Sequence, residues 1–117
     1  MVKTFKIQRT NEADLTVTGK VVAEAAGWRY YMRVVETLAG AFVLVIGDQV
    51  DEWQTTHYVL SRTGLLHTLH SFDTEPPVPG VRSLVNGWPD DVRVWQDLLE
   101  VVDAVLREIG GYADRAA

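Results

Sequence analysis

The sequence predicts an α+β domain in which a curved antiparallel meander of about five strands packs against one long amphipathic helix. Three observations lead to this prediction. Residues 1–60 hold short stretches of alternating polar and apolar residues, separated by turn-forming residues, as in antiparallel strands. Residues 89–109 place apolar side chains at helical spacing, and 62–72 do so over a shorter length.

The chain has 117 residues, a length that suits one domain. Three of its four prolines fall within residues 73–80, so this stretch is expected to be an extended connector and not a helix or an inner strand. The predicted layout is strands in 1–60, a short helix in 61–72, a proline-rich connector in 73–88, a helix in 89–109 and a tail in 110–117.

The first two strands are expected at Val2–Gln8 and Leu15–Ala25, joined by a polar turn. In the second strand the odd-numbered apolar residues share one face: Leu15, Val17, Val21, Ala23 and Ala25. Gly19 falls inside this register, so we expect a bulge, a bend or a close backbone approach there.

Three more strands are expected, at Trp28–Glu36, Ala41–Ile46 and Trp53–Leu60. Gly40 can take a positive φ in the turn before the second of these. Ala41–Ile46 has no polar residue on either face, which predicts a strand covered on both sides. Residues 47–52 are expected to form a loop, with Asp48, Asp51 and Glu52 at a solvated tip.

The long helix has strong start and stop signals, with Pro89 at its first position and Gly110 after its last turn. A helical projection divides it into an apolar arc of about half the circumference and a polar arc that includes Asp97. We expect the apolar arc to lie in the curl of the sheet. Ser61 or Thr63 can cap the shorter helix.

If the long helix covers one face of the sheet, the second face of Ala41–Ile46 still needs cover. Val35, Val43, Val45 and Tyr31 could form that second surface. Either the short helix or a second copy of the chain would cover it, because large exposed apolar patches are unusual on monomers. A homodimer is therefore expected as one of these two solutions.

The net charge of −5 argues against a nucleic-acid partner, since phosphate binding needs clustered Lys and Arg. The charge is uneven: residues 1–35 carry six basic and three acidic side chains, and residues 36–117 carry five and thirteen. Two interpretations stay open. The acidic part meets a basic protein partner, or it is a solvated surface that keeps the chain soluble.

The chain lacks cysteine, which excludes disulfides, thiolate metal sites and a thiol nucleophile. His67 and His70 would share a helical face, and Asp73 or Glu75 could add a carboxylate ligand. The same spacing fits two exposed polar positions on a short helix, and the glutamate of hydrolytic zinc helices is missing. We expect no metal and no cofactor.

Several aromatic side chains lie on neighbouring predicted strands, where they could line a ligand pocket between sheet and helix or fill the core. His57 is the best acid–base candidate among them. The candidate ligand-binding residues are Trp28, Tyr30, Trp53, His57 and Tyr58.

The function expected from these features is that of a small acidic, cytoplasmic, non-catalytic binding or accessory protein that engages a protein partner. The longest apolar run, Ala41–Ile46, is far shorter than the ~20 residues that span a bilayer, so no membrane partner is expected. The alternative is a small-ligand-binding protein or a minor enzyme that uses the aromatic pocket.

Overall fold

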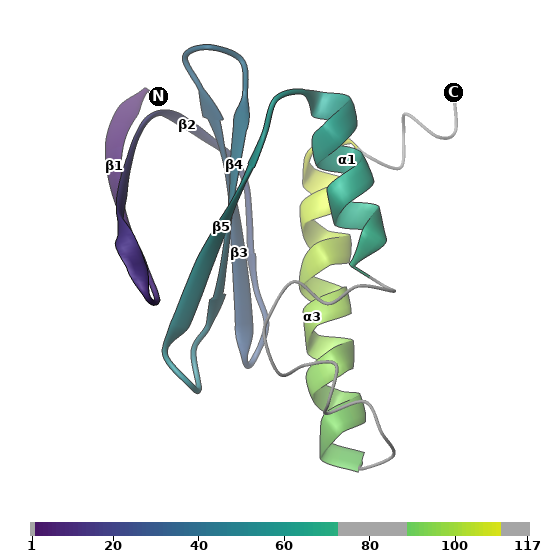
Figure 1. The fold of residues 1–117 in the computed structure, drawn as a ribbon. Helices are drawn as coiled ribbons and strands as arrows, with labels where there is room; N and C mark the ends of the chain where they lie inside the picture. Colours follow the sequence, from purple (N-terminus) through teal and green to yellow (C-terminus); the bar gives the residue numbers. More distant parts are fainter. Residues whose placement is uncertain (1, 73–88, 111–117) are drawn as a thin grey trace.

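The computed structural model describes residues 2–72 and 89–110. It has one antiparallel sheet in the order β1-β2-β3-β4-β5, with helices on one side of it (Figure 1). This arrangement confirms the predicted α+β class with a meander of strands and a C-terminal helix. The elements are β1 (Lys3–Arg9), β2 (Glu12–Ala26), β3 (Tyr30–Thr37), β4 (Phe42–Asp48), β5 (Trp53–Val59), α1 (Arg62–Ser71) and α3 (Pro89–Glu108). The predicted connector 73–88 and residues 111–117 of the predicted tail lie outside the described residues.

The sheet curls into a half-barrel because β2 is long enough to pair with two strands in succession. Its first half pairs with β1 and its second half with β3, and both ladders include Gly19. A Cβ on Gly19 would lie 2.1 Å from the carbonyl oxygen of Glu36. The close backbone approach expected at this glycine is therefore confirmed, and it permits the tight curl.

A β-bulge in β2 makes the odd-numbered side chains before and after it point to opposite faces of the sheet. The register shifts between Val21 and Ala23, so Val21 pairs with Val35 while Ala23 pairs with Val34. Opposed residues of a ladder point to the same face, and one extra residue reverses the alternation. The prediction that all the odd-numbered residues of this strand share one face is therefore wrong beyond Val21.

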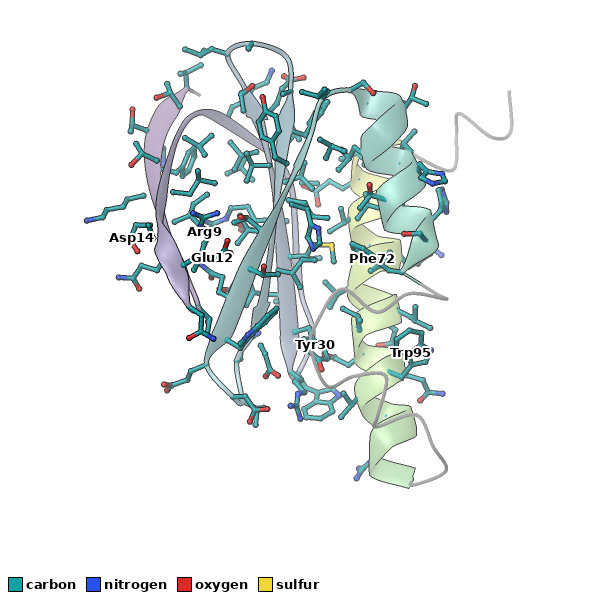
Figure 2. All side chains as sticks on the ribbon, viewed as in Figure 1. Arg9, Glu12, Asp14, Tyr30, Phe72 and Trp95 are labelled. Atoms are coloured by element: carbon teal, nitrogen blue, oxygen red, sulfur yellow. The ribbon has the colours of Figure 1, made fainter. Side chains whose placement is uncertain are left out.

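The main core lies between the helices and the outer face of the half-barrel (Figures 1 and 2). Helix α3 packs on β2 and β3, and α1 packs on β5 and α3. The expectation that α3 would lie in the curl of the sheet is wrong, because side chains of β1 and β2 fill the curl. The buried side chains that α3 contributes are Val94, Leu98, Val101, Val102, Val105 and Leu106.

A second, smaller core fills the inside of the curl. The arm formed by β1 and the first half of β2 folds over β3 and β4 there, on the side away from the helices (Figure 1). Strand β4 is consequently buried along its whole length, as its apolar sequence predicted. Its second face is covered by this arm and not by α1 or a second chain, so that argument for a homodimer loses its basis. The buried members are Ile7, Val17, Val35, Val43 and Val45, with Phe5, Leu15 and Tyr31 packed against them.

The helix and turn signals of the sequence act as expected. The Ser61 hydroxyl accepts a bond from the Gly64 amide at 3.1 Å, which caps α1. Gly40 and Gly110 have φ values of 83° and 77°, in the turn before β4 and after the end of α3. Arg62 of α1 donates to the carbonyl of Ile109 at 2.7 Å, so α1 also caps the end of α3.

Candidate functional site

The five aromatic and histidine residues proposed as ligand contacts lie in three places. Tyr30, Trp53 and His57 face the helix-side core, where Tyr30 is fully buried (Figure 2). Trp28 lies in the turn between β2 and β3 and is 60% exposed. Tyr58 is opposite Val43 on the inner face of the curl. The structure therefore does not gather all five around one space, and their role in ligand binding stays a prediction.

His57 is half-buried beside the main core. Its ring lies 6.0 Å from that of Phe72, and burial lowers the pKa of His57 below its usual value of 6.5. Within the described part of the chain, neither its Nε2 atom nor the Tyr30 hydroxyl has a hydrogen-bond partner. Burial raises the pKa of Tyr30. Both groups are therefore held in their neutral forms near neutral pH.

A concave site opens on the other side of the sheet, at the end of the curl where β1 approaches β5. Two adjoining pockets of about 420 Å³ each share three residues, Gln8, Tyr31 and Gln54. We call the second of these the Tyr31 pocket. Its lining is completed by Phe5, Lys6, Ile7, Arg33 and Val45.

Tyr31 is held in place by a glycine on the neighbouring strand. It pairs with Gly47, and a Cβ on Gly47 would lie 2.1 Å from the Tyr31 ring. The ring therefore packs directly against the backbone of β4 at Gly47. Burial raises the pKa of Tyr31, and the positive charge of Arg33 acts in the opposite direction. Gly47 was expected in a loop, but it belongs to β4.

Arg33 brings positive charge to the Tyr31 pocket, whereas Lys6 lies between Phe5 and Ile7 on β1, so its side chain leaves the opposite face of that strand. The Nε atom of Arg33 donates to the Glu24 carboxylate at 2.7 Å, and both side chains are partly exposed. The Lys6 ammonium lies 3.6 Å from the Asp14 carboxylate, and its side chain is 73% exposed. Each cation thus has one carboxylate nearby, in contact with solvent.

Gln54 closes this end of the half-barrel by joining β5 to the first hairpin. The Thr10 amide donates to the Gln54 carbonyl at 2.9 Å, and the Gln54 amide donates to the Thr10 hydroxyl at 2.9 Å. The Gln54 side chain also donates to the backbone carbonyl of Gln8. These bonds fix one wall of the pocket at an edge of the sheet that is otherwise open.

Two buried carboxylates hold the turns at the same end of the sheet. Asp48 is 4% exposed and accepts bonds from Arg29 at 3.0 and 3.1 Å, and Arg29 also reaches Asp51 at 2.8 Å. The expectation that Asp48 lies at a solvated tip is therefore wrong. Asp97 of α3 is 3% exposed, although the helical projection put it on the polar arc. It accepts three backbone N–H bonds from the turn that precedes β3.

The polar residues of the Tyr31 pocket were not singled out by the sequence. They come from β1, β3 and β5, so no local spacing connects them. The one available signal was the mixed face of Trp28–Glu36, where Arg33 interrupts a register that otherwise faces a core. A charged residue at such a position is informative because it brings a hydrogen-bond donor and a charge to the edge of an apolar face.

The remaining candidates do not form a metal centre among the residues described. His67 is exposed and His70 half-buried on α1, while Asp73 and Glu75 lie outside the described residues. Within residues 2–72 and 89–110, no three His, Asp or Glu side chains gather in a way that could hold a metal ion, and no helix there could span a membrane. No protein-family model, curated protein or solved structure matches this chain.

Proposed function

We propose that this chain is a non-catalytic binding protein that engages another protein at the open end of its half-barrel. This end carries the turn between β3 and β4 and the last residues of β5. Three large apolar side chains are exposed there: Leu38 by 71%, Tyr58 by 62% and Leu60 by 79%. Exposed apolar groups gathered at one end of a small domain are typical of contact surfaces.

The observation that carries the proposal is a hollow of about 350 Å³ bordered by two of these side chains. Leu38 and Tyr58 line it together with Leu15, Val17 and Val43. Interfaces draw most of their binding energy from a few aromatic and aliphatic anchors seated in such hollows. The predicted acidic surface is not needed for this contact, because apolar side chains and threonines line the hollow and no carboxylate does.

A photo-crosslinking amino acid at position 38 tests the proposal in the cells that produce the protein. We expect one discrete crosslinked partner, which disappears when Tyr58→Asp is added. The matched control places the same group at Val50, which is 55% exposed in the turn at the other end of the sheet. A crosslink to a second copy would support the homodimer, and equal products from positions 38 and 50 would contradict the proposal.

The second candidate function is the binding of a small ligand, and the Tyr31 pocket favours it. Ligand pockets are concave, have volumes of about 300–1,000 Å³ and combine an apolar lining with a few polar groups. The Tyr31 pocket has a volume in this range, about 420 Å³, and its lining is divided between apolar and polar residues. It lies on the face away from the helices, whereas the sequence suggested a pocket between sheet and helix.

A further inference from the structure

The Tyr31 pocket has an apolar side and a polar side, which together specify a class of ligand. The apolar side consists of Phe5, Ile7 and Val45, and the last two are buried parts of the inner core. The flat ring of Tyr31 forms an adjoining wall, fixed against Gly47. A flat or elongated apolar group can therefore lie against this floor and be removed from water.

The polar side is dominated by the guanidinium of Arg33. A guanidinium has five N–H donors in a planar fork, and in the described part of the chain Arg33 uses its Nε for the Glu24 carboxylate. The Nη donors remain for a second acceptor. Because this fork matches the geometry of a carboxylate, two parallel N–H···O bonds to one ligand carboxylate are possible.

We propose that the Tyr31 pocket binds an amphipathic monocarboxylate, with its apolar body on Phe5, Ile7 and Val45 and its carboxylate on Arg33. This inference rests on the second candidate function, small-ligand binding. Glu24 stays beside Arg33 and limits the local positive charge, which favours a monoanion over a phosphate group.

The probes for the test are 2-naphthoate and its neutral amide, 2-naphthamide, which share one apolar body. Binding to the full chain is measured by calorimetry at low salt. We expect naphthoate to bind about tenfold more tightly than the amide, since charge-assisted bonds are the stronger ones. Arg33→Met should abolish this preference, and Glu24→Gln should increase it by removing the negative charge that offsets that of Arg33.

The matched control is Arg107→Met on the outer face of α3, where the arginine is 73% exposed and paired with Asp103. It should keep the preference of the wild-type chain. Circular dichroism verifies that each variant is folded, and Arg33→Lys provides a second variant that keeps the charge but loses the fork. This lysine variant should retain part of the preference.

The outcomes distinguish a failure of the carboxylate assignment from a failure of small-ligand binding itself. Equal binding of the acid and the amide would overturn the carboxylate assignment and leave small-ligand binding intact. Failure of the wild-type chain to bind either probe would overturn both. A preference that survives Arg33→Met, or that Arg107→Met also removes, would place the carboxylate elsewhere and overturn the role of Arg33.

Discussion

The Asp97 carboxylate joins α3 to the half-barrel, and its removal is the sharpest test of the fold. Its two oxygens accept the backbone N–H groups of Trp28, Arg29 and Tyr30 at 2.9, 3.1 and 2.8 Å. Gly27 leaves the space that the carboxylate occupies, since a Cβ there would lie 2.0 Å from it. Three successive amides that have no strand partner at this turn therefore depend on one side chain.

The expected cost of Asp97→Ala follows from these three bonds. A hydrogen bond to a charged group contributes about 1.5–3 kcal/mol, and an unsatisfied buried donor costs about 1–3 kcal/mol. The amides of Trp28 and Arg29 lie near the surface, so water can replace the carboxylate for them, whereas the Tyr30 amide is buried. We expect a loss of about 3–5 kcal/mol in the free energy of unfolding.

Urea denaturation followed by circular dichroism measures this loss. Asp97→Asn keeps the shape and one acceptor oxygen, so it should lose about 2 kcal/mol. The control is Asp103→Ala, which removes a partly exposed carboxylate paired with Arg107 on the same helix and should change stability by about 0.5 kcal/mol or less. If Asp97→Ala were as mild as Asp103→Ala, the carboxylate would not hold the turn and the reasoning would be refuted.

Two further predictions concern the inner and outer faces of the sheet. Gly47→Ala should destabilise the fold by about 1–3 kcal/mol, because its methyl group would overlap the Tyr31 ring, and should cost far less in a Tyr31→Ala background. Urea midpoints of the wild type, the two single variants and the double variant measure this coupling. Equal costs of Gly47→Ala in both backgrounds would argue against the ring–glycine contact. For His57, the lowered folded-state pKa means that the unfolded chain takes up the proton first as the pH falls below 6.5. Wild-type stability should therefore decrease as the pH falls from 7.5 to the folded-state pKa. Urea midpoints measured over this range should fall less steeply in His57→Leu. An unchanged dependence of the midpoint on pH would contradict the burial of the imidazole.

The regular elements could be predicted from the sequence because local chemistry specifies them. Alternation or a short apolar run bounded by turn residues marks the strands, and the apolar arc of residues 89–109 marks α3. Gly40 marks a turn and Gly110 marks the end of α3, since glycine takes positive φ without a steric penalty. Each of these signals depends on neighbours a few residues apart, so the sequence alone determined it.

The sequence did not determine on which side of the curled sheet α3 packs; the tertiary structure did. One extra residue at the bulge between Val21 and Ala23 reverses the face to which the later side chains of β2 point. No composition or period in Leu15–Ala25 announces it, because both registers place apolar residues on a face. The predicted position of α3 inside the curl was wrong because side chains of β1 and the first half of β2 fill that space.

The candidate site was also beyond sequence reasoning. Asp48 and Asp97 look like solvated carboxylates until Arg29 and the backbone amides of a distant turn are placed beside them. Arg33 and Gln54 meet in one pocket only because the half-barrel brings β3 and β5 to the same hollow. Local sequence determined which segments are strands and helices. The burial of charges and the assembly of the pocket depend on packing between distant segments, which the periodicity of one segment does not encode.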